Sequence, residues 1–233
     1  MNVEERCEQL AAQFDLSEDA AGKLVRLLAL LADDQSSITS VRDPDEAVEI
    51  HVADSLTGLL VPELRGAGSI ADLGAGAGLP GLVLAVALPD SQVTLVESVG
   101  NKAAFIEKAA AELGLRNVSV EPVRAEEAEG LGSYDAVTAR ALGSLPLVLE
   151  YAAPLLREGG AVVAWKGERD GNEADAGERA AAQLGLSDPA WTKVEEGTVR
   201  GARSRHLVTC EKIEPTPERF PRRPGMARKR PLA

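Results

Sequence analysis

Residues 72–81 read DLGAGAGLPG, and they follow a short apolar run at 69–73 that has the length and composition of a buried strand. Glycines let the backbone turn sharply and let a ligand approach without an intervening side chain. The following apolar residues predict a helix over 79–88, whose first N–H groups are unpaired and carry the positive end of the helix dipole. The stretch therefore predicts a strand–loop–helix turn that binds an anionic group, either a pyrophosphate or a carboxylate.

A second acidic residue supports a nucleotide ligand. Glu97 ends the next predicted strand and stands 19 residues after Gly78. A carboxylate at this place can accept hydrogen bonds from both ribose hydroxyls of an adenosine. Folds that bind dinucleotides and folds that bind S-adenosylmethionine share this pair of features, so both ligands stay open. A glycine-rich turn without a ligand is the third interpretation.

Two observations favour S-adenosylmethionine. Asp72 directly precedes the glycines and gives the pattern D-x-G-x-G-x-G, in which its carboxylate can orient the loop and the amino group of the methyl donor. Helical sequence also precedes the first strand, whereas dinucleotide folds usually begin with that strand. The literal G-x-G-x-x-G made by Gly76, Gly78 and Gly81 keeps a nicotinamide oxidoreductase as an alternative.

The chain predicts an α/β fold preceded by helices. Strands and helices alternate from 69 to 185, a pattern typical of a parallel sheet covered on both faces. The predicted strands are 69–73, 92–97, 118–121, 134–138 and 161–166, and the predicted helices are 79–88, 101–113 and 145–156. A further strand pair is expected at 191–195 and 206–213.

These elements divide the chain into three parts. We expect an N-terminal helical cap at 1–65, a Rossmann-like domain at 66–213 and a basic, proline-rich tail at 214–233. In the cap, Ser17 is expected to start one helix, and Asp43 with Pro44 to start another. The buried face of the first helix would be formed by Leu24, Leu27, Leu28 and Leu31. The five prolines and six basic residues of the tail predict no regular structure without a partner.

Charge is distributed unevenly along the chain. The net charge is −12, but residues 200–233 hold ten basic and only three acidic residues. The negative net charge therefore bears on the solubility of the protein. The basic C-terminal end is a separate feature that either binds a polyanion or is simply exposed to solvent. The first residues carry charges and lack an apolar signal region, and no apolar run is long enough to span a membrane, so we expect a cytoplasmic protein. Cys7 and Cys210 are expected as free thiols, and no metal site is expected.

Several stretches resemble the 16S rRNA guanine-N7 methyltransferase family, RsmG, formerly called GidB. The resemblance spans nearly the whole chain, in order, and its most specific pieces are those at 38–56 and 72–81. The matching pieces are ITSVRDPDEAVEIHVADSL (38–56), DLGAGAGLPG (72–81), RAEE (124–127), AR (139–140), WKG (165–167), RH (205–206), and the tail with PRRPG and KRPL. The family implies a Rossmann-like class I methyltransferase with an N-terminal helical cap, S-adenosylmethionine as donor, and the decoding-region hairpin of 16S rRNA in the small ribosomal subunit as substrate. We expect a monomer.

The resemblance also implies donor-binding residues. Carried over position by position, they are Gly74, Leu79, Ala125, Glu126 and Arg140. Asp72, Gly76, Gly78 and Glu97 join them on the strand–loop–helix argument above. Without the resemblance, residues 124–127 would be interpreted as the start of an exposed acidic helix.

Two departures from the family pattern concern this site. The family usually has Asn-Leu-Thr where this chain has Ser37-Ile38-Thr39, so a substrate contact by this loop is not carried over. The segment after Glu97 usually ends in paired basic residues, whereas Asn101-Lys102 supplies only one. That change affects the expected affinity for the donor and leaves its identity as predicted.

Methyl transfer to guanine N7 needs no general base, because N7 has a free lone pair and no proton to lose. No catalytic residue is therefore expected, and positioning supplies the rate. The candidates on the substrate side share a polar side chain near the expected crevice; they are Arg140, Lys166, Arg205, His206, His51, Asp54 and Ser55. Arg140, Lys166 and Arg205 can hold O6, a phosphate or the cofactor but not N7, which must face the methyl group. The alternative for each is an ordinary surface or cap-docking residue.

Three other functions remain open on the residues alone. The first is a small-molecule methyltransferase with a dispensable tail, the second is the oxidoreductase, and the third is an adenosine-binding module without catalysis. For the RNA enzyme we expect the six basic tail residues to dock rRNA, so that deleting 215–233 weakens RNA binding and spares donor binding.

Overall fold

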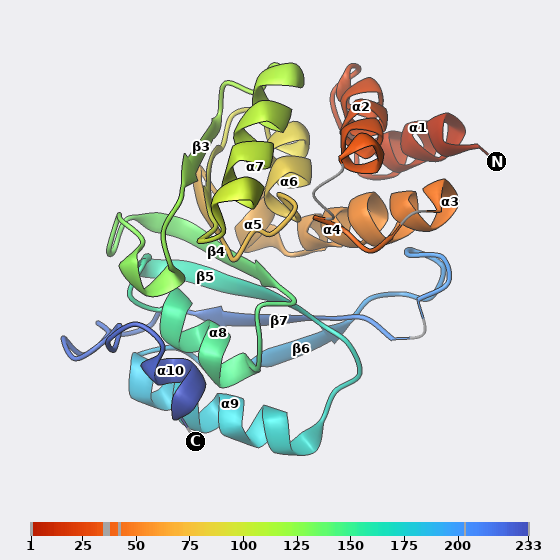
Figure 1. Ribbon diagram of the computed structural model, residues 1–233. Helices are drawn as coiled ribbons and strands as arrows, with labels where there is room; N and C mark the ends of the chain where they lie inside the picture. The colour runs from red at the N-terminus through yellow and green to blue at the C-terminus, as the bar shows by residue number, and fades with distance from the viewer. Residues whose placement is uncertain (1, 35–37, 42, 203, 233) are drawn as a thin grey trace.

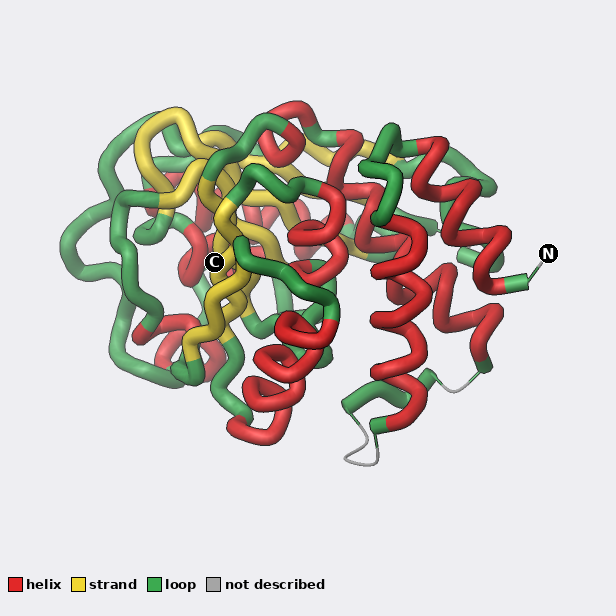
Figure 2. The backbone as a smooth tube through the Cα atoms, turned by 90° about the horizontal axis from the view of Figure 1, so that it is seen from above, coloured by secondary structure: helices red, strands yellow, loops and turns green. Residues whose placement is uncertain are grey.

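The computed structural model describes residues 2–34, 38–41, 43–202 and 204–232, which form a sheet flanked by helices (Figure 1). No helix in these described ranges is both long and apolar enough to cross a membrane. The N-terminal helices are α1 (Val3–Gln13), α2 (Ala20–Asp33), α3 (Pro44–Ala47), η1 (Val48–Ala53), α4 (Asp54–Leu56), η2 (Thr57–Leu60) and α5 (Pro62–Arg65). The views of Figure 1 and Figure 2 both place α1 and α2 to one side of the strands.

The sheet has seven strands in the order β3-β2-β1-β4-β5-β7-β6. The strands are β1 (Ser69–Leu73), β2 (Gln92–Val96), β3 (Val118–Glu121), β4 (Tyr134–Arg140), β5 (Leu156–Lys166), β6 (Ala190–Lys193) and β7 (His206–Glu211). The first five are parallel, and β7 is antiparallel to both of its neighbours. The strand order reverses between β1 and β4, which is where open α/β sheets form a ligand crevice at the carboxyl ends of the strands.

Side chains alternate between two separate cores, one on each face of the sheet. Ile70 and Val163 face a core shared with the N-terminal helices, α6 (Gly81–Ala87) and α7 (Gly100–Glu112). Ala71 and Val162 face a second core with α8 (Leu145–Ala152) and α9 (Gly171–Leu184). Figure 1 shows these two helical layers on opposite faces of the strands. The α/β class with a helical N-terminal part is therefore confirmed.

The helix that was predicted to start at Ser17 is confirmed as α2, but its predicted start is wrong. The four leucines at 24, 27, 28 and 31 are all buried, as the spacing predicted. Helix α2 begins at Ala20, however, and the Ser17 hydroxyl donates a hydrogen bond to the Asp19 carboxylate instead of accepting one from a backbone N–H of the helix. The second start is as predicted, because Asp43 accepts a hydrogen bond from the Glu46 N–H at 2.9 Å.

The helix that follows Asp43 does not stay regular. It changes to π-type turns over Val48–Ala53 and to 3₁₀ turns over Thr57–Leu60. A π-turn inserts one extra residue per turn and is frequent at functional sites. Glu49 and His51 in these turns, and Asp54 directly after them, are all buried.

Helix α9 was missed by sequence reasoning. It begins after Asp170, whose carboxylate caps the Glu173 N–H, and it ends at Gly185 with φ of 74°. Its buried side is made of small residues rather than the leucine stripe that marks a helix in sequence. A Cβ on Gly177 would lie 2.5 Å from Leu145 Cδ2, so the small residues let α9 approach α8 closely.

The tail is more ordered than predicted. Phe220 is buried in the second core, and Met226–Lys229 forms a short helix, α10, that packs beside α8 (Figure 1). Arg222 donates two hydrogen bonds to the buried Glu150 carboxylate of α8, at 2.6 and 2.5 Å. The prediction that prolines and like charges exclude regular structure here is wrong, because α8 supplies both an apolar surface and an opposite charge.

Candidate functional site

The side chain of Asp72 holds the loop at 74–80 in place. This side chain is fully buried and accepts hydrogen bonds from the Gly81 N–H and the Thr138 hydroxyl, each at 2.9 Å. The carboxylate therefore joins the end of β1 to the start of α6 and fixes the loop between them. Sequence reasoning also expected it to touch a ligand, but Asp72 is not among the residues that line the cavity described below.

The glycines of the loop have different structural roles. Gly74, Gly76 and Gly78 all have positive φ, a conformation that glycine adopts without strain. Gly74 and Gly76 line the cavity above the loop, as predicted for donor-binding residues. Gly78 does not: a Cβ there would lie 2.4 Å from Leu82 Cδ1, so this glycine allows close packing under the loop.

A cavity of about 600 Å³ opens at the carboxyl ends of β1, β2 and β4. Its volume is in the range of small-ligand pockets. Of the nine residues predicted to bind a donor, the cavity is lined by Gly74, Gly76, Leu79, Glu97, Ala125, Glu126 and Arg140. We call this space the donor cavity, after the methyl donor that the sequence predicts. The two predicted residues that do not line it, Asp72 and Gly78, support the loop.

Glu97 has the position expected for a ribose contact. It follows β2, is 6% exposed, and lines the donor cavity. Its Oε2 accepts a hydrogen bond from the Gly76 N–H and its Oε1 one from the Val99 N–H, both at 2.8 Å. These bonds fix the carboxylate against the glycine loop, and each oxygen keeps one lone pair for a hydroxyl donor.

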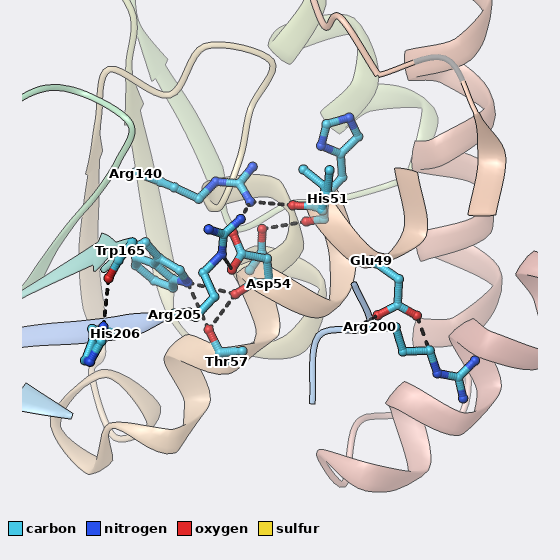
Figure 3. A network of polar contacts seen from close by, with 12 residues as sticks. Glu49, His51, Asp54, Thr57, Arg140, Trp165, Arg200, Arg205 and His206 are labelled. Carbon is cyan, nitrogen blue, oxygen red and sulfur yellow. Dashed lines mark hydrogen bonds and ion pairs between the residues drawn. The ribbon is translucent and has the colours of Figure 1, made fainter. Parts of the chain in front are cut away.

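An ion network of Asp54, Arg140 and Arg205 borders the donor cavity (Figure 3). Asp54 Oδ2 accepts a hydrogen bond from Arg140 Nη1 at 3.0 Å, and its Oδ1 accepts one from Arg205 Nε at 2.9 Å. The Asp54 side chain is 4% exposed, so its charge is almost fully shielded from water. The cap residue Asp54 thereby connects the end of β4 to the start of β7.

A second cavity of about 540 Å³ adjoins the donor cavity. We call it the acceptor cavity, because several of the substrate-side candidates expected from the sequence line it. Ile38, Thr39, His51, Arg140 and Ala141 line both spaces. The acceptor cavity is also lined by Asp54, Lys166 and Arg205. It therefore contains three cations and one carboxylate. The Lys166 ammonium is held in place by Glu173 Oε1 at 2.6 Å and by the Gly143 carbonyl at 2.7 Å.

Two substrate-side candidates, Ser55 and His206, lie outside the acceptor cavity, whereas the buried Trp165 is one of its lining residues. The Ser55 hydroxyl is buried and donates to the His51 carbonyl, and His206 bonds through Nδ1 to the Gly167 carbonyl; neither lines the acceptor cavity. Trp165 is a buried strand residue whose indole N–H donates to the Asp54 carbonyl at 2.7 Å (Figure 3). The Trp165 bond docks the cap on the sheet. The Ser55 bond lies within the cap itself, and the His206 bond joins the start of β7 to the segment after β5.

His51 is a neutral imidazole. Burial, and then the Arg140 charge, lowers its pKa to about 4, although Asp54 opposes this shift. Nε2 lies 3.0 Å from the Thr39 hydroxyl. Nδ1 is buried and has no hydrogen-bond partner among the described residues. A neutral His51 adds no positive charge at the junction of the two cavities.

The structure adds lining residues that the sequence did not assign to a donor site, among them Arg228, which was expected only to dock rRNA. Tyr151, Gly225 and Arg228 line the donor cavity together with the predicted Glu126. No local signal marks them, because Tyr151 lies inside a helix and the other two belong to the tail. In the altered loop, Ser37 lies outside the described residues. In the altered segment after β2, Lys102 lines the donor cavity.

We expect the Asp72→Asn substitution to keep the loop and to raise stability at alkaline pH. Burial raises the pKa of Asp72 to about 7, against the lowering effect of its bonds to Thr138 and Gly81. A raised folded-state pKa means that the stabilisation from the protonated form is lost as the pH rises toward 7. An asparagine can accept from the Gly81 N–H and donate to Thr138, and it carries no charge.

The variant should therefore exceed the wild type by on the order of 2–4 kcal/mol in unfolding free energy at pH 8, with the difference shrinking toward pH 4. Urea unfolding across this pH range measures it. A variant that is less stable than the wild type at pH 8 would show that the charged form of Asp72 is needed by the fold.

Comparison with known proteins agrees with this geometry. Residues 19–208 match the family described as rRNA small subunit methyltransferase G, GidB. The chain is 42% identical to the ribosomal RNA small subunit methyltransferase G of Rubrobacter xylanophilus over 208 residues, covering 85% of this chain and 78% of that protein. It is 40% identical to the protein of the same description from Deinococcus radiodurans, covering 94% and 89%.

Among solved structures, a geranyl diphosphate methyltransferase in complex with SAM superposes with a TM-score of 0.56 at 17% identity, over 77% of this chain and 95% of that one. At this identity the likeness concerns the fold alone, which is that of a Rossmann-like methyltransferase. The match to the family extends from the cap through the glycine loop to β7, and it includes every residue of the donor cavity except those of the tail. The chain therefore belongs to the rRNA small subunit methyltransferase G family.

Proposed function

We propose that this protein transfers a methyl group from S-adenosylmethionine to N7 of a guanine in 16S rRNA, in the decoding-region hairpin. The observation that carries the proposal is the pair of adjoining cavities. One has the glycine loop and the carboxylates of a nucleoside site, and the other is lined by three cations. Arg140 belongs to both, so a donor and an acceptor would meet beside it. The division into a cap (1–65), a methyltransferase domain (66–213) and a tail (214–233) is part of the proposal.

The donor cavity fits S-adenosylmethionine. Gly74 and Gly76 leave room for a ligand against the backbone, and Glu97 can accept from the ribose hydroxyls. Ala125 and Glu126 are at the place for the base. When bound, the donor supplies a sulfonium methyl group, which a ring nitrogen takes up with its lone pair and without losing a proton. The chain therefore has to orient two partners and exclude water, and needs no base.

The acceptor cavity suits a polyanion more than a neutral small molecule. Arg140, Lys166 and Arg205 would hold O6 of a guanine or a nearby phosphate, while Asp54 fixes the two arginines. The names of the relatives give ribosomal RNA of the small subunit as their substrate, and we extend it to this chain. Family membership does not support the oxidoreductase alternative. The alternative function of a small-molecule methyltransferase is distinguished by the following test.

We expect Lys166→Gln to raise KM for small-subunit RNA about tenfold and to leave donor affinity unchanged, because a tenfold change corresponds to the loss of one modest polar contact. Transfer of labelled methyl groups to small subunits that lack this modification measures KM, and calorimetry with S-adenosylhomocysteine measures donor affinity. The matched control is Lys193→Gln, since Lys193 is also paired with a glutamate but lies on exposed β6 and outside both cavities. Equal KM values for the two variants would show that the acceptor cavity does not bind the RNA. Label on small metabolites and none on RNA would favour the small-molecule enzyme.

A further inference from the structure

The C-terminal segment is built into the side of the molecule that holds the donor cavity. Phe220 and Ala227 are buried in the core formed by α8, α9 and the sheet. Arg222 pairs with Glu150 in α8, whose side chain is 1% exposed, and also donates to the Arg230 carbonyl at 2.8 Å. These contacts fix both ends of residues 220–230. The segment is thus held as a folded strap.

The strap reaches the donor cavity at Glu126. The Gly225 N–H donates to Glu126 Oε1 at 2.8 Å, and the Tyr151 hydroxyl donates to the same oxygen at 2.9 Å. Burial raises the pKa of Glu126, but the bonds from Gly225, from its own backbone and from Tyr151 outweigh it, so the pKa lies below its usual value. Glu126 is therefore an anion whose position depends partly on the tail.

Two tail residues, Gly225 and Arg228, line the donor cavity itself. Arg228 lies close enough to Tyr151 to lower the pKa of that phenol, although burial and Glu126 together raise it to about 12. The guanidinium of Arg228 is thus on the same side of the cavity as Glu126 and Tyr151. A planar guanidinium stacks well on an aromatic heterocycle.

The sheet order tells which part of the donor lies there. The glycine loop follows β1, Glu97 follows β2, and residues 123–126 follow β3, and these strands are neighbours in that order. A ligand with its amino-acid end at the loop and its ribose at Glu97 would extend its base toward Glu126. The strap is therefore at the base end of the cavity.

We propose that the C-terminal strap, through Gly225 and Arg228, is a wall of the methyl-donor site that holds the adenine of the donor. This inference rests on the proposed donor. It replaces the expectation that deleting 215–233 spares donor binding. The tail arginines would then have three different roles: Arg228 contacts the donor, Arg222 anchors the strap, and the exposed Arg223 can contact RNA.

The test compares two exposed tail arginines, Arg228→Ala and Arg223→Ala, in the full chain. Affinities are measured by calorimetry for S-adenosylhomocysteine and for methylthioadenosine, which shares the adenosine but lacks the amino-acid end. Arg228→Ala should weaken both ligands by about tenfold and by the same factor, and Arg223→Ala should weaken neither. Equal factors place the lost contact at the adenosine, which a general loosening of the loop would not do.

A truncation after Pro221 tests the whole strap. It is combined with Glu150→Gln, so that no unpaired charge stays buried in α8. This truncated chain should bind both ligands at least as weakly as Arg228→Ala. If Arg228→Ala and the truncated chain both bind S-adenosylhomocysteine within about twofold of the full chain, the strap is no part of the site. If the full chain binds neither ligand, the proposed donor is wrong, which is seen before any variant is compared.

Discussion

Gly76→Asp should abolish donor binding. Gly76 lines the donor cavity and has φ of 59°, and a Cβ built there would make an ordinary van der Waals contact with the Gly74 carbonyl oxygen at 3.8 Å. A carboxylate there would stand near Glu97, whose Oε2 is bonded to the Gly76 N–H, and near the place for the donor's own carboxylate. Two like charges at about 4–6 Å repel each other by roughly 3–4 kcal/mol near a protein surface. A penalty of this size weakens the affinity for the donor by at least about a hundredfold. Calorimetry with S-adenosylhomocysteine measures the loss.

The control for backbone strain is Gly114→Asp. Gly114 has φ of 66° and no atom within 4 Å of a built Cβ, but it is exposed after α7 and lies outside the donor cavity. Both variants therefore place an aspartate in a left-handed conformation, and their stabilities should fall by similar amounts. Normal donor affinity in Gly76→Asp, at a stability like that of Gly114→Asp, would mean that the glycine loop does not hold the donor.

Asp54→Asn should lower the rate of methyl transfer about a hundredfold, the size expected when a positioning group shifts by about 1 Å. Asp54 holds Arg140 at the junction of the two cavities and Arg205 in the acceptor cavity. An asparagine can keep only one of these bonds as an acceptor, and it leaves two arginines beside a neutral residue. Donor affinity should change much less, because Glu97 and the glycine loop stay in place. Single-turnover rates with small-subunit RNA at saturating donor separate the two effects.

Glu49→Gln is the matched control. Glu49 is also a buried cap carboxylate between two arginines, bonded to Arg6 at 2.6 Å and receiving the Arg200 N–H at 2.9 Å, and it lies outside the donor and acceptor cavities (Figure 3). Both variants should lose about 2–3 kcal/mol of stability, the usual size for a charged hydrogen bond. Only Asp54→Asn should lose transfer. Equal losses of transfer in both would reduce Asp54 to a docking residue of the cap.

Much of this arrangement follows from local sequence. The glycine loop and Glu97 could be placed because each stands directly after a short apolar strand, and parallel strands bring their carboxyl ends to one edge. The leucine face of α2 follows from its spacing alone. These signals depend on residues that are near one another in the chain, so they can be recognised without knowledge of the tertiary structure.

Other parts depend on contacts between distant segments. The tail was predicted to be irregular because its own residues cannot fold, yet Glu150, 72 positions away from Arg222, anchors it. Gly78 and Asp72 fit a ligand-binding pattern, but their buried neighbours Leu82 and Thr138 show that they support the loop. Arg140 and Arg205 lie 86 and 151 positions away from Asp54 in the chain, so the pairing of Asp54 with two arginines was not foreseen.

The most direct test of the central claim is to locate the methyl group. The protein is incubated with methyl-labelled S-adenosylmethionine and with either free 16S rRNA or small subunits that lack this modification, and the labelled nucleotide is then mapped by mass spectrometry. The account predicts one labelled guanine, methylated at N7, in the decoding-region hairpin of at least one of the two substrates, with the label absent for Gly76→Asp. Label at another base or ring position, or no label on either RNA by a protein that binds the donor, would contradict it.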